Sequence, residues 1–155
     1  MKNVFFSFHY ANDVNRANVV RNSWVIPGNK AAGFIDKADF EKIKLGGDPA
    51  IYNWIDEQLK GTSVTVVLIG EETASRKFVR YELQESYKRG NKIIGVYIHK
   101  IKDMRTGLTS NKGSICFGIL GKDCRGEDVY FSQIANVYDW VQDDGYNNFG
   151  YWLEH

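Results

Sequence analysis

Residues Ser63–Ile69, with the sequence SVTVVLI, decide the fold class of this 155-residue chain. The run is rich in apolar and β-branched residues, which is typical of a strand inside a parallel sheet that is covered on both faces. Two similar runs flank it, VFFSF at Val4–Phe8 and KIIGVYI at Lys92–Ile98. We therefore expect Ser63–Ile69 to be the central strand of the sheet.

Helical patterns fill the segments between these strands. Each begins at a residue type that favours a helix N-cap, and the three N-cap candidates are Asp13, Asp48 followed by Pro49, and either Thr73 or Ser75. The second helix carries apolar residues at four-residue spacing until Gly61, and the third is expected to end at Gly90. A short strand at Gly33–Ile35 and a polar loop at Lys37–Gly47 complete the first half.

The pattern is weaker in the second half. Three further elements are predicted there: a short strand around Ile115–Phe117, a fifth sheet strand within Gln133–Trp140 and a last helix starting at Asn147. The alternation of strands and helices predicts a flavodoxin-like three-layer α/β/α fold, with a five-stranded, mostly parallel sheet of strand order 2-1-3-4-5. We expect one domain, 1–155; residues 152–155 fit a native end, a truncated helix or a tag remnant.

Composition narrows the function classes. Lysine plus arginine number 20 and aspartate plus glutamate 19, and this balance argues against binding nucleic acid or membrane through bulk charge. The longest aliphatic stretch is far shorter than the about 20 residues that span a bilayer, and no signal peptide is visible. The two cysteines, Cys116 and Cys124, predict buried or inert thiols. We expect a cytoplasmic protein without a bound metal.

Familiar cofactor and hydrolase motifs are absent from the sequence. It has no P-loop, no G-x-G-x-x-G after a strand, no H-E-x-x-H, no C-x-x-C and no G-x-S-x-G. What remains is a pair of carboxylates, Glu82 and Glu85, on the third helix, and helical periodicity does not choose between them. Because that helix is rich in basic residues, Glu82 fits a solvated ion-pair partner as well as a catalytic group.

Four segments together resemble a known family. They are VFFSFHYAND in the first strand, GFIDKADFEKIKLGGD in the second strand and its loop, SVTVVLIGEETASRKFVRYE, and KIIGVYI. Their order and spacing are similar to a TIR (Toll/interleukin-1 receptor) domain, and to the TIR-like branch of bacterial Thoeris antiphage defence in particular. The C-terminal stretch NVYDWVQDDGYNNFGYWLE also resembles that branch.

The resemblance implies an enzyme that cleaves NAD as its substrate, needs no cofactor and makes a cyclic ADP-ribose-type messenger for a separate effector protein. It carries the catalytic role to Glu82 in the stretch FVRYE, where Phe78 stands at a position that is often Trp. The residues expected to contact NAD are Phe6, Phe8, His9, Asp36 and Phe78. The segment 37–48 matches a loop that contacts a neighbouring subunit, which implies self-association.

The same residues also have simpler explanations. Phe8 and Phe78 fit core packing, His9 fits a loop histidine, and Asp36 fits the end of a strand. A non-catalytic TIR-like adaptor that acts by self-association is therefore the alternative to the NAD-cleaving enzyme. The sequence leaves open the activating trigger, the product isomer and the effector.

Overall fold

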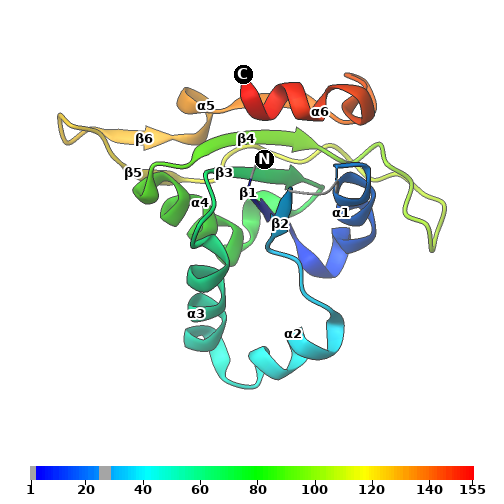
Figure 1. Ribbon diagram of the computed structural model, residues 1–155, viewed down its shortest axis with the longest axis horizontal. Helices are drawn as coiled ribbons and strands as arrows, with labels where there is room; N and C mark the ends of the chain where they lie inside the picture. The colour runs from blue at the N-terminus through cyan, green and yellow to red at the C-terminus, as the bar shows by residue number, and fades with distance from the viewer. Residues whose placement is uncertain (1–2, 25–28) are drawn as a thin grey trace.

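The fold is built on a five-stranded parallel sheet with the order β2-β1-β3-β4-β7 (Figure 1). The computed structural model describes residues 3–24 and 29–155. The strands are β1 (Asn3–Ser7), β2 (Lys30–Ala32), β3 (Val64–Ile69), β4 (Lys92–Tyr97) and β7 (Asn136–Asp139). The predicted flavodoxin-like fold and its strand order are therefore confirmed.

Helices cover both faces of the sheet, as the central strand requires. Every residue of β3 is buried. On one face Val4 and Phe6 of β1 pack with α1 (Tyr10–Trp24) and α6 (Gly145–Glu154). On the other face Phe5 packs with α3 (Gly47–Leu59), while α4 (Lys77–Arg89) covers β3. Since side chains alternate along a strand, Ser7 faces the same side as Phe5.

The C-terminal helix α6 closes one side of the core. Its Trp152 and Leu153 are buried with Phe149 in the cluster on the α1 side, so these two residues of the segment 152–155 are part of the hydrophobic core.

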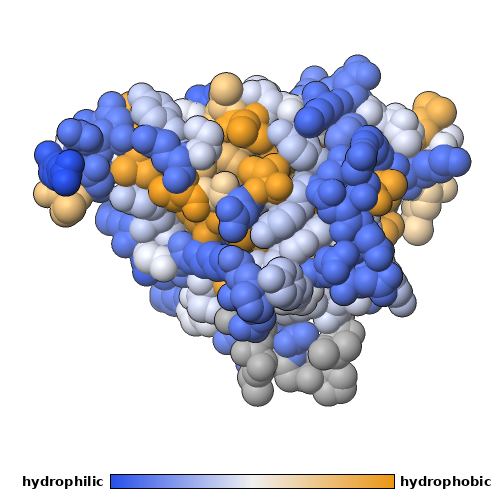
Figure 2. Space-filling model, turned by 90° about the horizontal axis from the view of Figure 1, so that it is seen from above, coloured by the Kyte–Doolittle hydropathy of each residue, from blue (hydrophilic) through white to orange (hydrophobic). Residues whose placement is uncertain are grey.

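Seen from the α5–α6 side, hydrophobic side chains reach the surface in the middle of a largely hydrophilic face (Figure 2). Ile134 and Val141 are 44% and 52% exposed. Single exposed apolar residues of this kind are normal on protein surfaces.

Residues 37–44 form a helix and a turn at 45–46 leads into α3, so the prediction of a polar loop at 37–47 is wrong. Helix α2 (Lys37–Lys44) begins after Asp36, whose Oδ1 accepts a hydrogen bond from Asp39 N at 2.8 Å. Lys42 and Lys44 lie in its last turn, where cations favour a helix. No residue of α2 is buried, and the sequence therefore lacks the hydrophobic periodicity that marks most helices.

The predicted helix starts are displaced by a few residues: α3 begins at Gly47 and α6 at Gly145, and α1 and α4 also differ from the prediction. Helix α1 begins at Tyr10, and the predicted cap Asp13 lies inside its first turn, buried and bonded to Arg16. Residues Thr73–Ser75 form a short 3-10 turn, η1, so that α4 begins two residues later. In both places a capping-type side chain serves another hydrogen bond; Thr73 Oγ1, for example, accepts one from Gly70 N at 2.8 Å.

Several strands also lie at residues other than those predicted. Strand β2 lies before Gly33–Ile35, and the predicted strand at 115–117 is replaced by an antiparallel hairpin of β5 (Ile119–Lys122) and β6 (Asp128–Tyr130). Helix α5 (Phe131–Ile134) takes the start of the segment 133–140. The sequence Pro27-Gly28-Asn29 predicts a loop, and this segment falls mostly outside the described residues.

Cys116 and Cys124 are both free and exposed, so the expectation that they are buried is wrong, while their inertness stays a prediction. They flank the β5 strand in a part of the chain where the sequence pattern is weakest. No helix within residues 3–24 and 29–155 combines the length and the hydrophobicity that a membrane crossing needs.

Gly33 should be essential for the fold. Its φ is +93°, and a Cβ atom there would lie 2.3 Å from the backbone oxygen of Phe6. We expect Gly33→Ala to lower the free energy of unfolding by about 3 kcal/mol or more, from left-handed strain plus the clash. The matched control is Gly61→Ala, which has φ +77° but no atom within 4 Å and should cost about 1–2 kcal/mol. Equal losses in denaturant titrations would contradict this account.

Candidate functional site

A pocket of about 190 Å³ lies at the carboxyl ends of β1 and β2. Residues from the β1–α1 and β2–α2 connections and from α2, α3 and α4 line it. Ligands of open parallel sheets bind at this edge, outside the carboxyl ends of the strands. Its walls are largely aromatic, and they include Phe6, Phe8, Tyr10, Phe40, Trp54 and Phe78.

Glu82 is the acidic residue among those lining this pocket. Its side chain is only 6% exposed, and Ser7 Oγ donates a hydrogen bond to its Oε1 at 3.1 Å. Burial raises the pKa of Glu82 to about 8, although the Ser7 hydroxyl opposes this shift. Within the described residues no cation pairs with Glu82. The interpretation as a solvated ion-pair partner is therefore wrong.

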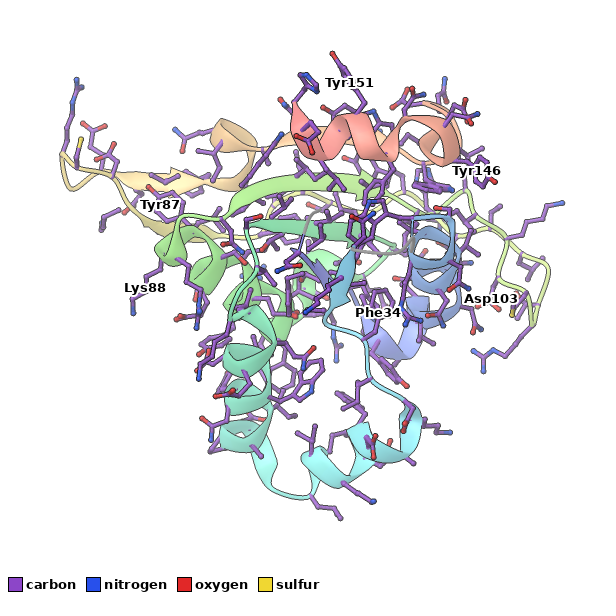
Figure 3. The ribbon with its side chains drawn as sticks, in the orientation of Figure 1. Phe34, Tyr87, Lys88, Asp103, Tyr146 and Tyr151 are labelled. Atoms are coloured by element: carbon purple, nitrogen blue, oxygen red, sulfur yellow. The ribbon has the colours of Figure 1, made fainter. Side chains whose placement is uncertain are left out.

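Glu85 lies elsewhere, although it is less than one turn further along α4. It is half-buried and lines a shallow groove together with Tyr87, Lys88 and the strand β5. Lys88 projects from α4 away from α2 (Figure 3). The structure thus brings Glu82, and not Glu85, into the aromatic pocket, a choice that helical periodicity alone could not make.

A row of neighbouring aromatic rings, two pairs stacked and one tilted, connects α1, α2 and the β2–α2 segment. The rings of Tyr10 and Phe40 lie 4.8 Å apart with an interplanar angle of 26°. Phe8 follows at 6.3 Å from Tyr10, and Phe34 lies 5.2 Å from Phe8. Because α2 buries no residue, the Tyr10–Phe40 contact is one of the interactions that hold it beside the pocket.

Of the other residues predicted to contact NAD, all but Asp36 line the pocket. Phe78 is half-buried, and Phe6 is fully buried and also packs into the core on the α1 side. With Phe8, His9 and Glu82, these residues line the pocket. Asp36 does not line it. It is exposed at the start of α2, and its hydrogen bond to the Asp39 backbone lowers its pKa.

His9 is a buried polar residue of the pocket wall. It is 8% exposed, and its Nδ1 has no hydrogen-bond partner within the described residues. Burial lowers the pKa of His9, Arg76 lowers it further, and Glu72 acts in the opposite direction. A neutral imidazole is therefore favoured at neutral pH, and it can both donate and accept a hydrogen bond.

Sequence reasoning missed several lining residues, among them Phe40, Lys44, Trp54 and Arg76. The first two lie on α2, which was expected to be a loop. Trp54 lies three residues after Ile51, so its place on the buried side of α3 could have been found from helical spacing. No sequence signal distinguishes Arg76 from the other basic residues nearby.

The chemistry of the pocket favours a cationic, aromatic guest. In the empty pocket the carboxyl group of Glu82 favours its protonated form, because no cation among the described residues offsets its desolvation. A bound cation would favour its ionised form, and aromatic faces attract cations as well. The described parts of the chain contain no group of three or more histidine, cysteine, aspartate or glutamate side chains that could hold a metal ion.

Comparison with known proteins identifies the class to which this fold and pocket belong. Residues 5–103 match the family described as Thoeris protein ThsB, TIR-like domain, a span that contains every residue lining the pocket. The chain is also 38% identical to a Bacillus cereus (strain MSX-D12) protein over an alignment of 190 residues, which covers 98% of each chain. That relative is named "Putative cyclic ADP-D-ribose synthase ThsB1".

The chain therefore belongs to the Thoeris ThsB family of TIR-like proteins. The resemblance inferred from the sequence is confirmed. The roles assigned to Glu82, Phe6, Phe8, His9, Asp36 and Phe78 stay predictions.

The buried Glu82 should make stability depend on pH. Its pKa of about 8 lies well above the value of about 4.3 expected in the unfolded chain. Between these values only the folded state holds the proton. The free energy of unfolding should therefore fall as pH rises, by up to about 1.4 kcal/mol per pH unit.

Glu82→Gln tests this dependence. Glutamine cannot ionise but can still accept the Ser7 hydrogen bond, so the variant should lose the slope and exceed the parent in stability at pH 8.5. Denaturant titrations at pH 5.5, 7.0 and 8.5 measure the difference, with Glu85→Gln as the control outside the pocket. Parallel curves for the parent and Glu82→Gln would disprove the assignment.

Proposed function

We propose that this protein cleaves NAD at the nicotinamide–ribose bond and releases a cyclic ADP-ribose-type messenger in antiphage defence. Membership of the Thoeris ThsB family and the name of the relative support the proposal. The observation that carries it is the buried, unpaired carboxyl group of Glu82 in an aromatic pocket at the carboxyl edge of the sheet. NAD is consumed as the substrate, and no separate cofactor is proposed.

Glu82 would act electrostatically. The nicotinamide ring of NAD is cationic, so its entry into the pocket favours the carboxylate form of Glu82. When the bond between the nicotinamide nitrogen and the ribose carbon breaks, its electron pair leaves with nicotinamide, which departs neutral. Positive charge then develops on the ribose, where a preorganised carboxylate stabilises it. The Ser7 hydroxyl, 3.1 Å from Oε1, holds the carboxylate in place.

The aromatic walls would decide the fate of the ribose centre. Phe8, Tyr10, Phe40 and Phe78 can cover the ring systems of NAD and limit the access of water. A nucleophilic adenine nitrogen of the same molecule then captures the ribose carbon, and the overall reaction releases nicotinamide and one proton. Where water enters instead, the product is linear ADP-ribose.

We also propose that the protein self-associates through the segment 37–48 and that a separate effector protein reads the messenger. In this segment Leu45 is 89% exposed, and α2 buries none of its residues within the chain. Exposed apolar groups on a helix that has little packing of its own suit a contact between copies.

Glu82→Gln should abolish most of the activity. Because it removes the negative charge beside the reacting ribose, nicotinamide release should fall about 10²–10³-fold. Glu85→Gln is the matched control, since it removes the same charge from the same helix outside the pocket. Chromatography of nicotinamide and mass spectrometry of nucleotides from phage-infected cells measure the outcome.

Two results would count against the enzyme. Equal messenger in the parent and Glu82→Gln would remove the catalytic role from this pocket. A parent that forms no nicotinamide, in vitro or during infection, yet still protects cells would favour the non-catalytic adaptor. Melting curves of both variants exclude unfolding as the cause of a loss.

Turnover should depend on self-association. We expect nicotinamide release per subunit to fall on dilution, and Leu45→Glu to shift this fall to higher protein concentration. Leu108→Glu is the control, because Leu108 is also an exposed leucine, at 65%, but lies outside the segment 37–48. Constant activity per subunit down to concentrations at which light scattering shows only monomer would refute the dependence.

A further inference from the structure

We propose that Arg76, together with Lys44 across the pocket, binds the diphosphate of the dinucleotide and so directs its nicotinamide end toward Glu82. This inference rests on the proposed function, because it concerns the same pocket. It assigns a positioning role to two residues that the sequence did not single out.

Arg76 is held at the pocket by its backbone while its side chain stays free. It directly precedes α4, where its N–H donates to Thr73 O at 3.2 Å and its carbonyl accepts from Arg80 N at 3.1 Å. The side chain is exposed and lines the pocket. Within the described residues its guanidinium makes no hydrogen bond or ion pair, so its donors are available to a ligand.

The neighbouring cationic side chains, Lys77 and Arg80, already have partners within the chain. Lys77 pairs with Asp48, which links the starts of α3 and α4. Arg80 donates from Nε to Ala74 O at 2.8 Å. Of the nearby acids, Glu72 accepts a hydrogen bond from Asn12 Nδ2 at 2.9 Å. Arg76 therefore differs from these neighbours, because its side chain has no partner among residues 3–24 and 29–155.

The N-terminal end of α4 adds to the attraction for an anion. No side chain caps the first turn of this 13-residue helix, so its leading N–H groups and the positive end of its dipole stay available. The buried His9, whose Nδ1 has no partner among the described residues, lines the same pocket as Arg76. Three features of this pocket thus favour a ligand with hydrogen-bond acceptors.

Lys44 supplies a second cation from the opposite element. It lies in the last turn of α2 and lines the pocket, with its Nζ 5.6 Å from the centre of the Phe40 ring. Its ion pair with Glu41 is long, at 3.9 Å, and both side chains are about half exposed. Such a pair contributes little, so Lys44 can turn toward a bound phosphate.

The resulting charge pattern matches one orientation of NAD. Glu82 is buried, whereas Arg76 and Lys44 are exposed. NAD carries a cationic ring at one end and a dianionic diphosphate in the middle. With nicotinamide beside Glu82, both charges meet opposite charges. A reversed dinucleotide would place the neutral adenine beside Glu82 and leave the nicotinamide cation in solvent. Bidentate arginine contacts suit phosphate oxygens particularly well.

Binding of ADP and adenosine by calorimetry tests the proposal without any turnover. The parent should bind ADP more tightly than adenosine, since only ADP carries the diphosphate. We expect Arg76→Gln to weaken ADP binding about 10- to 100-fold, the loss typical of a charged hydrogen-bond partner, and to leave adenosine binding unchanged. Lys44→Gln should act in the same direction with a smaller effect. Lys88→Gln is the control, because it removes one positive charge from α4 outside the pocket.

Kinetics give a second readout. Because the diphosphate contact is the same before and during bond breaking, Arg76→Gln should raise KM for NAD and change kcat less than about threefold. Glu82→Gln should show the reverse, with kcat lost and ADP binding kept.

Each outcome separates this inference from the proposed function. If Arg76→Gln binds ADP as tightly as Lys88→Gln, or if the parent binds ADP and adenosine equally or binds neither, the diphosphate site is wrong. If the parent discriminates through Arg76 but releases no nicotinamide, the site stands and the NAD-cleaving function fails.

Discussion

The hydrogen bond between Ser7 and Glu82 joins the central sheet to the helix that forms one wall of the pocket. Ser7 is the last residue of β1 and faces the α4 side because side chains alternate along the strand. A carboxyl group buried at this point costs free energy when it ionises, and one hydroxyl donor offsets only part of that cost. The protein therefore tolerates a group that would be stabilised fully only by a cation supplied from outside the chain.

This constraint is consistent with an aromatic pocket in which no cation of the described residues forms an ion pair with Glu82. A lysine or arginine paired directly with Glu82 would neutralise it and leave no demand for a cationic ligand. Aromatic rings exclude water and still interact favourably with a cation. The surrounding elements also differ in how firmly they are held. Helix α4 is anchored through Val79 and Leu83 in the core, whereas α2 has no fully buried residue and packs only through the half-buried Phe40 and Ile43.

The sequence predicted the parts of this structure that depend on burial. The runs at β1, β3 and β4 are apolar because both faces of the sheet are covered, and they gave the strand order correctly. It failed at α2, whose stability comes from the Asp36 cap and its charged ends rather than from a buried face. For the site, the resemblance selected Glu82 over Glu85, but the burial of Glu82 depends on contacts with β1, 75 residues away. Arg76 could not be found because its distinguishing property is the absence of a partner.

Position 78 holds phenylalanine, whereas the family that the sequence resembles often has tryptophan there. Phe78 is half-buried, its ring meets Tyr52 edge-on at 5.5 Å, and Lys77 Nζ lies 5.1 Å from its centre. A tryptophan there would bring an indole N–H that needs an acceptor, whereas phenylalanine brings none. The carboxyl group of Glu82, one turn further along the helix, thus has no donor competing for it from this position. Within the described chain its side-chain donor is Ser7 alone, and its second oxygen accepts no hydrogen bond there.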